Sequence, residues 1–130
     1  MANNEKQTVM SATDLDVYKV AYELAMEIFH ASKHWPKEEK FSLTDQVRRS
    51  SRSVCSNLRE AWSKRRYEAH FISKLTDCDG ENSETGTWLD FANDCNYLPD
   101  DQYKNLAEKC NRVGSMLGAM VKNPKPFLIK

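Results

Sequence analysis

The sequence is poor in residues that interrupt helices and has no long apolar run. Four prolines and four glycines in 130 residues exclude a collagen-like or low-complexity chain. No apolar run approaches the roughly 20 residues of a membrane-spanning helix. Residues 1–13 are polar and lack the apolar core of a signal peptide. We therefore expect a disordered lead over residues 1–13, a cytoplasmic location and no membrane partner.

Cysteine and histidine are too sparse to indicate a metal site. The cysteines are Cys55, Cys78, Cys95 and Cys110. They include no Cys-x-x-Cys pair, and a reducing compartment disfavours disulfides, so we expect four buried, reduced thiols. Glu27 and His30 form half of the paired motif of di-iron bundles, but the second half is missing. We predict no metal site, no cofactor and no catalytic residue, and hence a protein that is not an enzyme.

Hydrophobic periodicity predicts an all-α protein with one bundle over residues 14–122 and a C-terminal tail over 123–130. The apolar seams indicate helices over about 14–33, 43–64, 67–97 and 101–122. Ser42 with Asp45 predicts a capping-box-like start for the second helix, and Asp100 a cap for the fourth. The short connections predict antiparallel up-down-up-down neighbours.

Two helices have unusual apolar faces. On the first helix, two apolar rows together span about 200° of the surface, more than one neighbour covers. We expect that helix to contact several partners, within the bundle or across a subunit boundary. The predicted seam of the third helix is Phe71, Leu75, Cys78, Asn82, Thr85, Leu89 and Ala92. Two of its seven positions, Asn82 and Thr85, are polar, which predicts a polar layer in the core.

Charge is balanced overall, with 19 basic and 19 acidic residues, but it is segregated along the chain. Net charge therefore predicts no affinity for nucleic acid, and only local clusters could provide it. Residues 44–66 carry seven basic and two acidic side chains, whereas 76–101 carry eight acidic and none basic. We interpret this as pairing between the second and third helices. Arg48 or Arg52 is expected to reach Glu81 or Glu84 beside Asn82, with a nucleic-acid surface as the alternative.

A second basic cluster lies at the predicted turn between those helices. It consists of Lys64, Arg65 and Arg66, followed by Tyr67. Lys and Arg at an exposed turn can bind phosphate, and a nearby tyrosine can stack on an unpaired base. These four residues are our candidate site for a nucleic-acid or protein partner.

Several strings of this sequence resemble the family of proteins encoded in intervening sequences of 23S rRNA genes. These strings are LDVY at 15–18, WPKEE at 35–39, LTDQVRRSS at 43–51, KRRY at 64–67 and ETGTWLDFA at 84–92. The likeness spans about residues 14–120. It implies a bacterial four-helix bundle that assembles into a homopentameric ring. Relatives that are accessory proteins of diversity-generating retroelements bind a reverse transcriptase and nucleic acid through a basic surface.

The sequence departs from the family pattern at Arg59, where a small residue is usual, at Glu81, and in its acidic third helix. The acidic helix argues against a wholly basic ring. We hypothesise a non-enzymatic oligomeric scaffold that binds structured RNA or a nucleic-acid-processing protein through a basic rim. The alternative is a purely structural protein–protein adaptor with no nucleic-acid binding.

Overall fold

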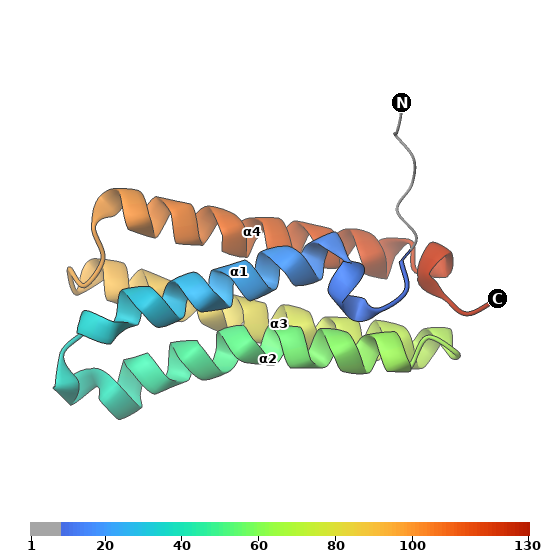
Figure 1. Ribbon diagram of the computed structural model, residues 1–130, viewed down its shortest axis with the longest axis horizontal. Helices are drawn as coiled ribbons and strands as arrows, with labels where there is room; N and C mark the ends of the chain where they lie inside the picture. Colours follow the sequence, from blue (N-terminus) through green and yellow to red (C-terminus); the bar gives the residue numbers. More distant parts are fainter. Residues whose placement is uncertain (1–8) are drawn as a thin grey trace.

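The computed structural model describes residues 9–130, so most of the expected N-terminal lead, residues 1–8, lies outside the described residues. Four long helices follow one another: α1 (Asp16–Ala31), α2 (Asp45–Ser63), α3 (Glu68–Asp94) and α4 (Asp100–Lys122). Residues 9–130 contain no strand, which confirms the all-α prediction with four helices. Successive helices run back alongside one another (Figure 1). α1 and α3 each pack against both α2 and α4.

The chain is ordered earlier than expected at its N-terminal end. Ala12–Asp14 forms a 3-10 turn before α1, and Ala12 is buried. The carboxylate of Asp14 accepts hydrogen bonds from the backbone N–H groups of Met10 at 2.8 Å and Ser11 at 3.0 Å. These bonds lower the pKa of Asp14. The expected disordered lead therefore does not extend through residues 11–13. These residues form a hydrogen-bonded turn before α1.

Both predicted helix caps are wrong. The chain already forms a π-helical turn at Lys40–Thr44, so Ser42 lies inside the helical segment. Its hydroxyl donates to Glu39 Oε1 at 2.7 Å. Asp100 is the first residue of α4, and no side chain caps that helix. The helical segment before α2 thus starts at Lys40, three residues before the predicted 43, and α4 starts at Asp100, one residue before the predicted 101.

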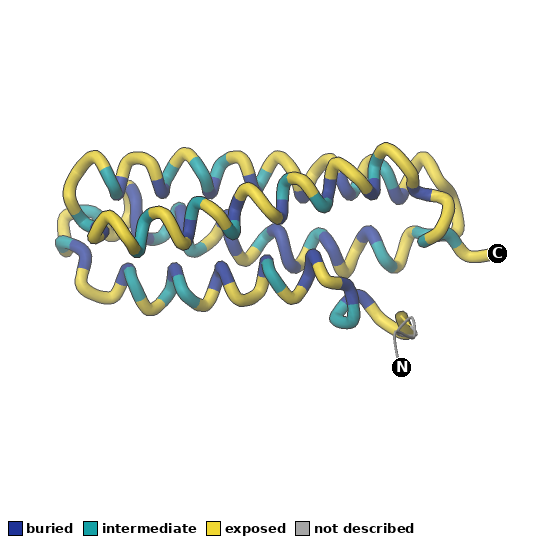
Figure 2. The backbone as a smooth tube through the Cα atoms, turned by 90° about the horizontal axis from the view of Figure 1, so that it is seen from above, coloured by how far each residue is buried: buried dark blue, intermediate teal, exposed yellow. Residues whose placement is uncertain are grey.

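The predicted seam of α3 is buried at every position. Its members are Phe71, Leu75, Cys78, Asn82, Thr85, Leu89 and Ala92. Along all four helices the buried positions recur on the side that faces the bundle axis, as the alternating colours of Figure 2 show. Tyr22 of α1 is an exception among the predicted apolar rows, because its side chain is 54% exposed.

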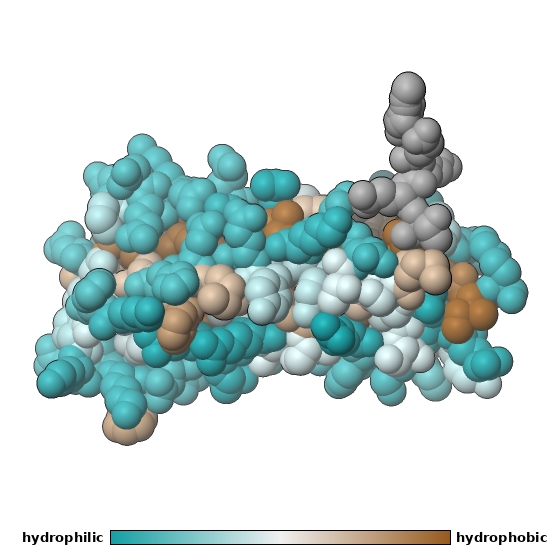
Figure 3. All heavy atoms as spheres, in the orientation of Figure 1, coloured by the Kyte–Doolittle hydropathy of each residue, from teal (hydrophilic) through white to brown (hydrophobic). Residues whose placement is uncertain are grey.

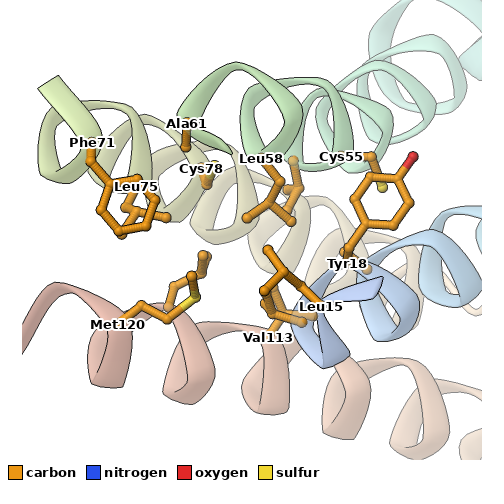
Figure 4. Close-up of a cluster of buried hydrophobic side chains, with 14 residues drawn as sticks. Leu15, Tyr18, Cys55, Leu58, Ala61, Phe71, Leu75, Cys78, Val113 and Met120 are labelled. Atoms are coloured by element: carbon orange, nitrogen blue, oxygen red, sulfur yellow. The ribbon is translucent and has the colours of Figure 1, made fainter. Parts of the chain in front are cut away.

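The buried apolar side chains form two clusters along the bundle. One of them joins α1, α2, α3 and α4 near the end of the bundle where the C-terminus lies. In Figure 4, Tyr18, Leu58, Leu75 and Met120 come from different helices and point into the space between them. The C-terminal tail adds Phe127, which packs against Phe71 with ring centroids 6.2 Å apart.

The turn after α3 depends on one residue with a positive φ. Asn96 has a φ of 63°, in the left-handed region where asparagine is one of the tolerated residues. The N–H of Tyr97 then bonds to the carbonyl of Ala92 at 2.9 Å. The chain reverses direction at this bonded turn and continues into α4. No helix among residues 9–130 is both long and apolar enough to cross a membrane.

Candidate functional site

The predicted basic cluster lies at the tight turn between α2 and α3. α2 ends at Ser63, and the N–H of Tyr67 bonds to the carbonyl of Lys64 at 3.3 Å. Lys64 and Arg66 are exposed, and Tyr67 is 60% exposed. The turn is at the end of the bundle where the C-terminus lies (Figure 1). Two cations and one aromatic ring are thus presented to solvent side by side.

Arg65 differs from its neighbours in that its side chain folds back onto the protein. Its guanidinium lies 3.6 Å from the centroid of the Trp62 ring. It donates to the carbonyl of Trp62 at 2.8 Å and to that of Phe127 at 3.4 Å. Burial lowers the pKa of Arg65. The Arg65 side chain is therefore held by Trp62 and the C-terminal tail and is less accessible than Lys64 and Arg66, and its role in binding stays a prediction.

Groups next to the turn modify its surface. Tyr67 packs edge-on against His70, with ring centroids 5.4 Å apart, which fixes the tyrosine ring while leaving it accessible. The one acid that opens α3, Glu68, pairs with Lys125 of the tail at 3.4 Å. Lys125 therefore offsets the charge of Glu68, and neither Lys64 nor Arg66 forms an ion pair within residues 9–130.

Arg48 and Arg52 do not reach Glu81 or Glu84. Arg48 Nε donates to the hydroxyl of Ser32 at 2.8 Å. The guanidinium carbons of Arg48 and Arg52 lie 4.9 and 5.5 Å from the ring centroid of Phe29 on α1. The predicted network is wrong because positions 48 and 52 face α1, one helical step of about 100° away from the side that faces α3.

Arg49 makes the contact that was expected of those arginines. Its guanidinium lies 2.9 Å from Glu84 and 3.8 Å from Glu81. Glu84 also accepts a hydrogen bond from the indole of Trp88 at 3.3 Å. The Arg49 side chain is 54% exposed, so this is a surface network that spans α2 and α3. An arginine at this position was visible in the sequence, but its direction depended on the packing of the helices.

The polar layer inside the core is made of neutral groups. Asn82 donates from Nδ2 to the carbonyl of Cys110 at 2.9 Å, which connects α3 to α4. Ser50 and Thr85 share a hydrogen bond of 2.8 Å between their hydroxyls, which connects α2 to α3. Thr85 also donates to the carbonyl of Glu81 at 2.9 Å. The predicted layer at Asn82 and Thr85 therefore has partners without any arginine.

The cysteines are unpaired, and three of them are buried. Burial raises the pKa of Cys55 to about 11, of Cys78 to about 12 and of Cys110 to about 11. These thiols are poor nucleophiles near neutral pH because only the thiolate reacts. Cys95 is exposed at the end of α3, so the expectation of four buried thiols is wrong at that position. Residues 9–130 contain no cluster of three His, Cys, Asp or Glu side chains that could hold a metal ion.

Comparison with known proteins places this geometry in a family. No curated protein matches the chain. The fold is similar to a crystal structure from Bacteroides thetaiotaomicron VPI-5482, described as a protein with unknown function from the S23 ribosomal protein family. That chain is 29% identical, with a TM-score of 0.73, and the likeness covers 82% of this chain and 96% of the other. Residues 13–119 match the sequence profile described as 23S rRNA-intervening sequence protein. The chain belongs to the family of 23S rRNA-intervening sequence proteins.

Proposed function

We propose that this protein is a non-enzymatic, cytoplasmic scaffold that self-associates and binds structured RNA through the turn between α2 and α3. The observation that carries the proposal is the exposed pair Lys64 and Arg66 beside the accessible ring of Tyr67. Two neighbouring cations bind phosphate groups through their charge and do not distinguish between bases. A tyrosine face adds stacking on an unpaired base, worth about 1–3 kcal/mol per base.

Self-association would bring several copies of this small basic cluster together in one oligomer. The first helix buries residues on both of its apolar rows and still leaves Tyr22 54% and Met26 40% exposed. Exposed apolar side chains on an otherwise packed helix favour a further protein contact. In a cyclic homo-oligomer, most simply the pentamer of its relatives, every copy of the basic turn lies at the same end. A chain with no net charge would then present a strongly positive rim.

The test of self-association is light scattering at micromolar protein concentration. We expect a mass several times the 15.0 kDa of one chain, and a pentamer in the simplest case. A mass of 15.0 kDa across the whole range contradicts the proposed assembly.

The test of RNA binding is fluorescence anisotropy with a structured RNA that contains an unpaired loop, measured from low to physiological salt. We expect log affinity to fall with log salt by about 0.7 per phosphate contacted on single-stranded segments. The variant Lys64→Ala/Arg66→Ala should lose most of the binding. The matched control Lys37→Ala/Lys40→Ala removes the same charge at the other end of the bundle and should bind like the native protein. Equal losses in both variants, or no native binding at low salt, contradict the RNA proposal.

Failure of RNA binding would favour the second candidate, a protein–protein adaptor. A specific feature supports it: Phe41 is 75% exposed and Phe91 54% exposed at the bundle end away from the basic turn. Phe91 lines a small cavity with Trp88 and the exposed Cys95, and Ser42, the residue after Phe41, lines it as well. If the protein is an adaptor, replacing Phe41 and Phe91 with serine should abolish binding of its protein partner. RNA binding should not change.

A further inference from the structure

The four grooves between neighbouring helices differ in how their charges are satisfied. Ion pairs close two of them. Across α2 and α3, Arg49 pairs with Glu84 at 2.9 Å and Lys74 with Glu60 at 3.4 Å. Across α1 and α4, Lys109 pairs with Glu27 at 2.7 Å. These two grooves therefore contain cations and carboxylates that compensate each other within one chain.

The groove between α1 and α2 carries cations that have no carboxylate partner in the described part of the chain. Arg48 and Arg52 lie over Phe29, and Arg59 lies 5.6 Å from the centroid of the Tyr18 ring. Arg52 and Arg59 are exposed, so water and these rings are their main surroundings. Three arginines on one face thus make the α1/α2 side positive.

Apolar side chains project from the same face. Tyr22 is 54% exposed and Met26 40% exposed, and together with Arg52 and Arg59 they form exposed walls of a hollow of about 360 Å³ between α1 and α2. Figure 3 shows pale and brown spheres that interrupt the hydrophilic surface along the middle of the side on which α1 lies. We refer to Tyr22, Met26, Arg52 and Arg59 as the α1/α2 ridge.

The groove between α3 and α4 has the opposite character. It is a hollow of about 710 Å³ whose lining contains the carboxylates of Asp79 and Asp90 and no Lys, Arg or His. Its lining includes small residues, among them Gly86, Ala107 and Gly114, so the hollow is open to large side chains. We refer to this hollow as the α3/α4 groove.

We infer that the α1/α2 ridge of one copy docks into the α3/α4 groove of the next copy. The inference rests on the proposed self-association and names the surfaces that produce it. The ridge is positive with two projecting apolar side chains, and the groove is acidic with a lining of small residues. Opposite potentials on two surfaces favour their contact and set its register, while the apolar side chains supply buried area.

The placement of the two surfaces determines the kind of assembly. Because α1 and α3 each contact α2 and α4, the α1/α2 and α3/α4 grooves lie on opposite sides of the bundle. A contact between two different surfaces is heterologous, so each copy uses its ridge on one neighbour and its groove on the other. Such a contact closes into a ring when the rotation between copies fits, and extends as a filament otherwise.

The experiment reverses the charges of each surface and measures mass by light scattering. The ridge variant Arg52→Glu/Arg59→Glu and the groove variant Asp79→Arg/Asp90→Arg each place like charges across the contact. Each should weaken assembly by at least about tenfold and approach the 15.0 kDa mass, since like charges at an interface cost several kcal/mol. All four substitutions in one chain restore opposite charges and should restore the native mass. The control Lys37→Glu/Lys40→Glu changes the charge by the same amount as the ridge variant. These positions lie outside both surfaces, so the control should assemble normally.

A steric variant covers the case in which charge reversal prevents folding. Ser115 lines the groove and is exposed, so Ser115→Trp fills the groove without touching the core. It should lower the mass, whereas Ser73→Trp on the exposed surface of α3 should not. Helical circular dichroism identifies folded variants. If the folded variants keep the native mass, the contact lies elsewhere and this inference is overturned while self-association stands. If the native protein itself has a mass of 15.0 kDa, the proposed self-association fails as well.

Discussion

Replacing Asn82 with alanine should destabilise the bundle more than replacing Glu84, although both residues are polar and lie on α3. Asn82 is 5% exposed, and its amide donates to the carbonyl of Cys110 on α4 at 2.9 Å. The substitution deletes this buried hydrogen bond, worth about 1 kcal/mol, and a weak 3.5 Å bond from the Cys110 thiol to Asn82 Oδ1. It also removes side-chain atoms from a packed helix interface, which adds about 1 kcal/mol for lost contacts and the space left behind. We expect a loss of about 2 kcal/mol in the free energy of unfolding.

Glu84 has a different environment, and its loss should be milder. Its side chain is 35% exposed, and its ion-pair partner Arg49 is 54% exposed. Exposed ion pairs contribute about 0–1 kcal/mol, because water screens them and both side chains lose rotamer freedom. If Arg48 or Arg52 were buried against Glu84, its removal would cost more than about 1.5 kcal/mol. The observed partner is Arg49, so we expect Glu84→Ala to cost less than about 1 kcal/mol.

Urea unfolding followed by circular dichroism measures both values. All variants must be compared at one protein concentration, because the proposed self-association would add a concentration-dependent term to stability. Asn93→Ala, a half-buried asparagine on the same helix, serves as the control for substitution of an amide. A loss above about 1.5 kcal/mol for Glu84→Ala together with less than about 0.5 kcal/mol for Asn82→Ala would refute the reasoning, because the charged network would then dominate.

Three further outcomes can be checked on the same protein. A thiol reagent near neutral pH should modify one cysteine, Cys95, in the folded protein and all four in denaturant, as counted by mass spectrometry. Hydrogen bonds from Ser42 and Tyr97 lower the pKa of Glu39, so its stabilisation is present above the ordinary value of 4.5 and lost as pH falls through the folded pKa. Glu39→Gln should therefore reduce the loss of stability on acidification in thermal melts. Asn96→Gly should raise the free energy of unfolding by up to about 1 kcal/mol, since glycine adopts positive φ without strain.

Periodicity predicted most of the buried face of each helix, with Tyr22 of α1 as an exception. On α3, residues from Phe71 to Ala92 follow the helical repeat, and all seven predicted positions are buried, including the polar Asn82 and Thr85. Burial of a helix face depends on the local order of residues along one element. The repeat therefore contains the information directly, whichever neighbour covers the face.

Which neighbour a side chain meets could not be predicted in the same way. Arg48 and Arg49 are adjacent in sequence, yet one faces Phe29 of α1 and the other Glu84 of α3. One residue turns a helix by about 100°, so the rotation of α2 about its own axis decides which of the two arginines faces which neighbour. The rotation is set by packing of all four helices. A helical wheel of α2 alone therefore does not give this rotation.

Arg65 shows a second limit of prediction from sequence, because its partners lie far from it along the chain. Locally it belongs to a run of three basic residues at a turn, and nothing nearby distinguishes it from Lys64 or Arg66. Its carbonyl and guanidinium are fixed by Ile129 and Phe127 of the C-terminal tail. The ends of helical segments posed a similar problem, because the π-helical turn before α2 places Ser42 inside the helix.

The distribution of charge connects the proposed assembly to the proposed RNA site. A chain with equal numbers of basic and acidic residues has no net attraction for phosphate, so binding requires that the two signs be separated in space. In the proposed assembly, the arginines of each α1/α2 ridge meet the acids of the next α3/α4 groove, which neutralises both on the sides of the bundle. Lys64 and Arg66 lie at the end of the bundle, outside that contact, and remain available. Docking of the side surfaces would thus remove acidic groups that repel RNA and leave the basic turns as the dominant field.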